Sequence, residues 1–135
     1  MSTNLMAYQM TEGLSQSFEA DGAVTKHMAV IAGSADNQVS PPTAANDEPV
    51  GIAAHAAADG EDVDVRYWGP AIGIASAAIT RGALVAIAGT TGKLAAIAPG
   101  TTTADLRVVG RAMQDAAADG DQFTVFLLNN PFVIV

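Results

Sequence analysis

Two stretches of the chain follow the same pattern: VGIAAHAAADGEDVDVRYW at residues 50–68 and VGRAMQDAAADGDQFTVFLL at residues 109–128. Each runs from Val-Gly through Ala-Ala-Ala-Asp-Gly to an acidic residue and then into a strand-like run. One extra residue near Asp115 shifts the offset between the two copies from 59 to 60. Alanine richness alone does not place Val-Gly and Asp-Gly twice in the same order, so we interpret the pair as an internal duplication.

The match extends upstream of both copies. The segment AVTKHMAVIAG from Ala23 parallels AITRGALVAIAG from Ala78, with one inserted residue. The repeat units are therefore about 23–68 and 78–128. Two copies are too few for a solenoid, which needs at least three stacked units. We expect one β-domain over residues 23–135, built from two similar halves related by a pseudo-twofold.

Short runs of Val, Ile and Ala, cut by Gly, Pro, Asn and Asp, predict an all-β fold, either a small barrel or a sandwich. The alanine triplets Ala56–Ala58 and Ala116–Ala118 are each expected to form one helical turn. The candidate strands are Val24–Ala32, Val50–Ala54, Val63–Trp68, Ala71–Ala75, Ala83–Ala88, Lys93–Ile97, Arg107–Met113 and Phe123–Leu128.

Aligning Gly60 with Gly120 separates the two faces of the strand that ends each repeat, because side chains alternate along a strand. The shared core face comprises Val63, Val65 and Tyr67 in one copy and Phe123, Val125 and Leu127 in the other. The opposite face is polar up to Trp68 in the first copy but carries Phe126 and Leu128 in the second. Phe126 and Leu128 therefore need another surface to shield them from water. An apolar strand at the end of the chain likewise needs a pairing partner. We therefore predict that subunit contacts involve Trp68, Phe126, Leu128, Phe132 and Ile134.

The first 22 residues differ from the rest, because their apolar residues follow neither a helical nor a strand period. Ordering such a segment alone costs more backbone entropy than its few apolar side chains return. We predict an N-terminal arm over residues 1–22 that becomes ordered when it docks on a partner. Its predicted contact residues are Leu5, Met6, Tyr8, Met10, Leu14 and Phe18.

Charge and composition narrow the possible partners. Six Lys and Arg against 14 Asp and Glu give a net charge of −8, which disfavours nucleic-acid binding. The absence of cysteine excludes disulfides and thiolate metal sites. No apolar stretch is long enough to span a membrane, and the opening MSTNLMAYQMTEG lacks a secretory pattern, so we expect synthesis in the cytoplasm.

No constellation in the sequence predicts catalysis, a cofactor or a metal site. GTTGK at 89–93 lacks the spacing of a phosphate loop and predicts a hairpin. The acidic run DGEDVD at 59–64 lacks the spacing of a calcium loop and reads as a solvated turn. His27 and His55 occupy non-equivalent positions of the repeat and have no ligand-spaced neighbour. We therefore expect a protein that is not an enzyme.

The second repeat also resembles the head decoration, or capsid cement, proteins of tailed bacteriophages. The residues that carry the resemblance are Thr80-Arg81-Gly82, Thr91-Gly92-Lys93-Leu94, Val109-Gly110-Arg111-Ala112, Ala116–Asp121 and Thr124–Leu127. The resemblance covers 78–128 well and 23–68 more loosely, where the segment 34–49 with Pro41-Pro42 interrupts the pattern.

This resemblance implies a small barrel or β-tulip-like module on the outer surface of the expanded capsid in the virion. It implies that the module stabilises the shell by clamping neighbouring major-capsid subunits, as a homotrimer with a free N-terminal arm. Two alternatives remain open. One is another virion component, such as a tail-tube or head-fibre subunit, and the other is a carbohydrate-binding β-module that uses exposed aromatic rings near Trp68.

Overall fold

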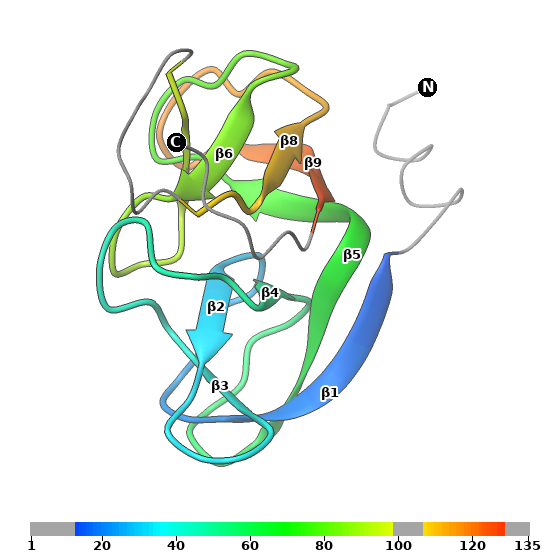
Figure 1. Ribbon diagram of the computed structural model, residues 1–135, viewed down its shortest axis with the longest axis vertical. Coiled ribbons are helices and arrows are strands. Elements are labelled where there is room, and N and C mark those ends of the chain that lie inside the picture. Colours follow the sequence, from blue (N-terminus) through cyan, green and yellow to red (C-terminus); the bar gives the residue numbers. More distant parts are fainter. Residues whose placement is uncertain (1–12, 99–106, 129–135) are drawn as a thin grey trace.

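The computed structural model describes residues 13–98 and 107–128, and within them the chain is all-β (Figure 1). This confirms the predicted fold class. The strands are β1 (Leu14–Ala20), β2 (Ala29–Ala32), β3 (Gln38–Ser40), β4 (Gly51–Ala53), β5 (Asp62–Ile74), β6 (Leu84–Ile87), β7 (Leu94–Ala96), β8 (Gly110–Ala112) and β9 (Gln122–Leu127).

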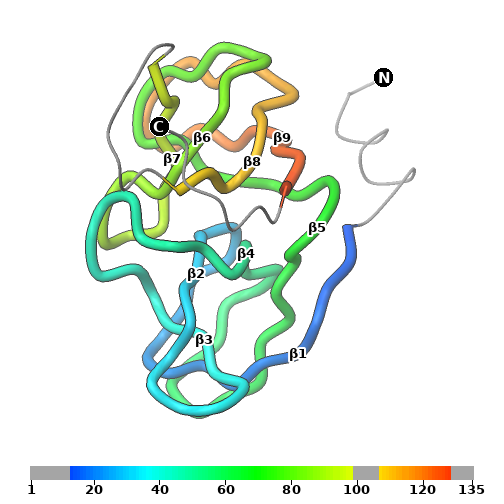
Figure 2. Tube along the Cα trace, viewed as in Figure 1, coloured from blue at the N-terminus to red at the C-terminus, as the bar shows by residue number. Residues whose placement is uncertain are grey.

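The first five strands form a closed barrel. Their order is β1-β3-β2-β4-β5, and β1 pairs with β5 to complete the ring. The remaining strands build a second barrel on the other half of β5, in the order β5-β9-β8-β6-β7. A parallel bridge between Ala75 and Leu94 links the end of β5 to β7. The tube in Figure 2 shows the two barrels stacked end to end, with β5 running through both.

Strand β5 differs from the prediction, which broke it into two strands at Gly69-Pro70. It is one strand of 13 residues. Its N-terminal half pairs with β1 and β4, and its C-terminal half pairs with β9. Gly69 adopts a positive φ of 85°, which a glycine tolerates without steric cost, so the chain bends there while the strand continues.

The duplication is visible in the backbone hydrogen bonds, and it begins earlier than the sequence indicates. Ala20 N–H donates to the carbonyl of Glu61 at 2.8 Å, and Ala75 N–H donates to that of Asp121 at 2.9 Å. Strand β1 in the first barrel is thus equivalent to residues 69–75 in the second. The first unit therefore starts near Gly13 rather than at residue 23.

Strand β1 differs from the expectation of an arm through residue 22. Residues Leu14–Ala20 pair antiparallel with β5 and parallel with β3, so they belong to the first barrel. Strands β3 and β5 provide the surface on which β1 is ordered. The irregular spacing of apolar residues in β1 did not predict this pairing. Residues 1–12 lie outside the described residues, and for them the arm stays a prediction.

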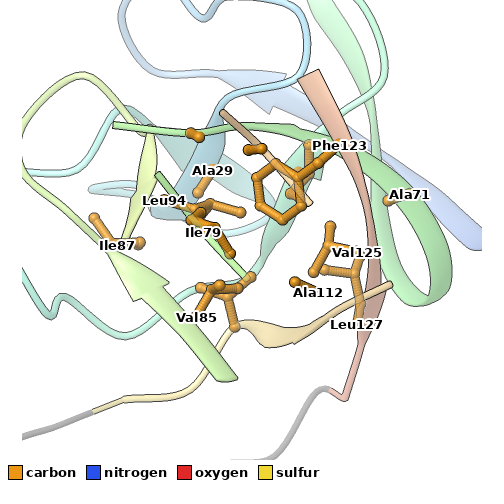
Figure 3. Packing of buried hydrophobic residues seen from close by; sticks show 14 residues of the cluster. Ala29, Ala71, Ile79, Val85, Ile87, Leu94, Ala112, Phe123, Val125 and Leu127 are labelled. Atoms are coloured by element: carbon orange, nitrogen blue, oxygen red, sulfur yellow. The ribbon is translucent and has the colours of Figure 1, made fainter. Parts of the chain in front are cut away.

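Two apolar cores fill the barrels and match position by position. The first comprises Ala20, Val24, Val30, Val39, Ala53, Ala57, Val63 and Val65. Their equivalents in the second, part of which Figure 3 shows, are Ala75, Ile79, Val85, Leu94, Ala112, Ala116, Phe123 and Val125. The second cluster also takes in Ala29 and Ile52 from the first repeat, and in this way the two barrels are packed together.

The repeated sequence motifs have structural reasons. A Cβ at Gly51 would fall on the carbonyl oxygen of Arg66, and a Cβ at Gly110 would fall on that of Phe126. Val-Gly is therefore repeated because two strands approach closely at this point. The expected helical turns at the alanine triplets are wrong: Ala57 and Ala116 instead form bridges to Val24 and Ile79. The predicted hairpin at Thr91-Gly92 is confirmed by the pairing of Ile87 with Leu94.

Candidate functional site

Exposed apolar side chains gather where the two barrels meet. Leu14 at the start of β1 lies opposite Trp68 of β5, and the next residue, Gly69, pairs with Leu127 near the end of β9. Leu14, Trp68 and Leu128 are 59%, 46% and 36% exposed. We call the set Leu14, Trp68, Phe126 and Leu128 the junction patch.

The aromatic part of the junction patch is ordered by a ring contact. The rings of Trp68 and Phe126 meet edge to face, with centroids 5.2 Å apart and an interplanar angle of 78°. This geometry is favourable for aromatic pairs, and it leaves Phe126 half-buried while much of Trp68 faces solvent. Contiguous exposed apolar groups on a small domain are typical of protein-contact surfaces.

The sequence placed Trp68, Phe126 and Leu128 in one predicted contact set, and the structure brings them together. Leu14 was assigned to the arm but joins the same patch. Phe18 was also assigned to the arm, yet it packs against the first core. The remaining predicted contact residues lie outside the described residues, and their roles stay predictions: Leu5, Met6, Tyr8, Met10, Phe132 and Ile134.

The sequence did not predict a further exposed apolar residue, Met113. It is 51% exposed and follows β8, where its backbone N–H donates to the carbonyl of Thr124 at 2.8 Å. The signal was its position in the repeat: it follows the inward-facing Ala112, so alternation turns it outward.

A shallow groove opens at the mouth of the first barrel. It has a volume of about 350 Å³ and is lined by Gln16, Phe18, Pro49, Val50 and Tyr67. Tyr67 was predicted to lie on the core face, but it is only half-buried because it lines this open mouth. Its equivalent in the second barrel, Leu127, is 2% exposed.

Both histidines have roles in the local backbone structure. His55 Nε2 accepts the N–H of Asp64 at 3.2 Å. His27 adopts a positive φ of 67° in a turn where the second repeat has Gly82. Partial burial, with Lys26 and Arg66 nearby, lowers the pKa of His27 from its ordinary value.

The acidic residues cap turns. Glu61 accepts the N–H of Ala58 at 2.8 Å, and Asp121 accepts that of Ala117 at 3.0 Å. The Asp21 carboxylate accepts two hydrogen bonds from Ser34, which hold the pKa of Asp21 below its ordinary value. Among the described residues, no group of three or more His, Cys, Asp or Glu is placed to hold a metal ion. No helix within residues 13–98 and 107–128 has the length and apolarity to cross a membrane.

Together these features define a duplicated β-barrel module with an apolar contact surface. A family model described as phage cement protein matches residues 8–127, so the chain belongs to the phage cement protein family. It is therefore a structural, capsid-associated protein of the virion. This confirms the resemblance seen in the sequence.

A solved structure extends the likeness of the fold. The head fibre gp8.5 N base of bacteriophage phi29 is 19% identical, with a TM-score of 0.64 over 88% of this chain and 97% of that chain. At this identity the likeness concerns the fold alone. No curated relative matches the chain.

Proposed function

We propose that the protein binds the outer surface of the expanded capsid and clamps neighbouring major-capsid subunits, acting as a homotrimer. The observation that carries this proposal is the junction patch on a chain of the cement family. Leu14, Trp68 and Leu128 expose apolar area to water at the point where both barrels meet. Burying that area against a capsid subunit is favourable by roughly 25 cal/mol per Å².

The predicted arm adds a second contact. Residues 1–12 precede Gly13, whose N–H donates to the Pro70 carbonyl at 3.2 Å beside the junction patch. A segment tethered there and bound to one capsid subunit, while the patch contacts the next, gains avidity without needing either contact to be strong. This arrangement supports a clamp rather than a single-point attachment.

The test is co-sedimentation with the shells of the source virus, comparing expanded with unexpanded shells. Saturable binding to expanded shells only, at a fixed ratio to capsid protein, is the expected result. Phe126→Asp should weaken the binding about tenfold or more. Gln122→Asp is the matched control, because it adds the same charge at an exposed position of the same strand. Equal binding by both variants would remove the junction patch from the proposal.

The structural likeness favours a second candidate, the base of a head fibre. Both functions require shell binding, so the discriminating measurement is the temperature at which empty shells rupture. A clamp raises that temperature in proportion to occupancy, whereas a fibre base leaves it unchanged.

A carbohydrate-binding role would use the half-exposed Trp68 as a stacking platform. Glycan-array binding that disappears in Trp68→Ala would support that role and count against the clamp.

A further inference from the structure

The two barrel mouths differ although their strands are equivalent. In the second barrel, the positions that correspond to Gln16, Val50 and Tyr67 are Ala71, Val109 and Leu127. These side chains are 6%, 3% and 2% exposed. In the first barrel the same positions are half-buried or exposed and enclose the groove of about 350 Å³. One mouth is thus covered and its twin is open.

The open mouth has the chemistry of a site for an apolar, extended segment. Two aromatic rings, a proline ring and a valine line it, with Gln16 as the polar member. Its volume lies near the lower end of the range for sites that take small ligands or a few side chains. Grooves lined by aromatic residues are a recurrent way to bind extended segments, best known for proline-rich ones.

The repeat itself points to the occupant. Residues 69–75, GPAIGIA, follow the half of β5 that ends the first repeat, and they leave that barrel to form a wall of the next one. The offset of 60 maps them onto residues 129–135, NNPFVIV, which follow the last strand of the second repeat. Both segments are uncharged in their side chains and contain one proline, and the second is apolar from its proline onward. By this equivalence we expect segment 129–135 to leave its own repeat and to contact a further barrel.

Charge favours the same arrangement. Residues 13–68 carry nine Asp and Glu against two Lys and Arg, whereas residues 69–128 carry four of each sign. Two acidic first repeats repel each other when they meet face to face. A head-to-tail contact instead sets the acidic repeat of one copy against the neutral repeat of the next.

We propose that segment 129–135 of one copy docks in the groove formed by Gln16, Phe18, Pro49, Val50 and Tyr67 of a second copy. Phe132 is the anchor, and Asn129-Asn130-Pro131 is the spacer that leads away from Leu128. Seven extended residues reach at most about 25 Å, which sets the largest distance from Leu128 to the groove of the second copy that the segment can span. A head-to-tail contact of this kind closes into a ring when the rotation permits, and a ring of three would match the proposed trimer.

The test is sedimentation velocity of the full chain over a range of concentrations, without capsid. The expected result is self-association that Phe132→Ser weakens about tenfold or more, with Tyr67→Ser acting in the same direction from the groove side. Thermal unfolding of Phe132→Ser is measured beside the unchanged chain, so that a loss of docking is distinguished from a loss of barrel stability. Met113→Ser is the matched control, because Met113 is exposed, apolar and not among the residues that line the groove.

A mixture of isotope-labelled and unlabelled chains identifies the occupant. Nuclear Overhauser contacts between the Phe132 ring of one chain and Phe18 or Val50 of another are expected. The proposal would be overturned if the contacts lie within a single chain, if residues 1–12 occupy the groove instead, or if the full chain stays monomeric. The experiment contains no shells, so its outcome is independent of the co-sedimentation test of capsid binding.

Discussion

His55 and Gln114 perform the same task in the two repeats with different chemistry. Gln114 Oε1 accepts the backbone N–H of Thr124 at 2.9 Å, as His55 Nε2 accepts that of Asp64 at 3.2 Å. Both side chains thus satisfy a backbone donor in the strand that ends the repeat, which gives the histidine a structural role.

This equivalence predicts that His55→Gln preserves stability while His55→Ala loses it. The alanine variant leaves the Asp64 N–H without its acceptor, at a cost of about 0.5–1.5 kcal/mol in the free energy of unfolding. Denaturant unfolding at neutral pH measures the difference. A glutamine variant as unstable as the alanine variant would contradict the shared role.

The turn at His27 predicts a pH dependence of stability. The pKa of His27 is lowered in the folded state, so the unfolded chain binds its proton first as the pH falls. Stability from this group is therefore fully present above the ordinary pKa of about 6.5 and is lost as the pH falls toward the folded value. Unfolding curves between pH 8 and pH 5 should show this decline.

His27→Asn should flatten the decline, because asparagine tolerates a positive φ and does not titrate. His55→Gln serves as the control variant, which retains His27. An unchanged pH profile in His27→Asn would assign the effect to other groups.

The close strand approaches predict a contrast between glycines. Gly51→Ala and Gly110→Ala place a methyl group against backbone carbonyls that have no room to move, and each should destabilise the fold by about 1–3 kcal/mol or more. Gly89→Ala is the control, since nothing lies within 4 Å of its added Cβ. Thermal unfolding of the three variants checks the prediction, which fails if all three melt alike.

Strand β1 predicts where the chain tolerates truncation. Deleting residues 1–12 should leave the β-type circular dichroism and the cooperative unfolding intact, because the described barrel begins at Gly13. Deleting residues 1–22 removes β1, which closes the first barrel against β5 and β3, and should destabilise or unfold that barrel. Equal stability of the two truncations would restore the boundary at residue 22.

The sequence predicted those parts of the fold in which the two repeats have the same residue types at equivalent positions. Val-Gly, Asp-Gly and the alternating apolar strands could be predicted because steric constraints limit which residue types fit at these positions. Strand β1 was not readable, because LSQSFEA and its equivalent GPAIGIA share only their final alanine. The two segments share a pattern of backbone hydrogen bonds, and this pattern does not require particular side chains.

The candidate site was predicted in part for a similar reason. Comparing the two copies exposed Trp68, Phe126 and Leu128 as apolar residues on the face opposite the core. It could not show that Leu14 lies opposite Trp68, since that contact depends on the register between β1 and β5. Nor could it show that Tyr67 lines an open mouth while Leu127 is buried, because burial depends on how one barrel covers the other.

Strand β5 gives the molecule a mechanical property. Its two halves are hydrogen-bonded into different barrels, so the barrels share one strand, and we expect them to move as one body. A force on one barrel is passed to the other through this continuous strand and its lateral hydrogen bonds. If the protein clamps two capsid subunits as proposed, a shared strand keeps the joint closed under internal pressure, because a spacer that stretched would let the joint open before it bore any load.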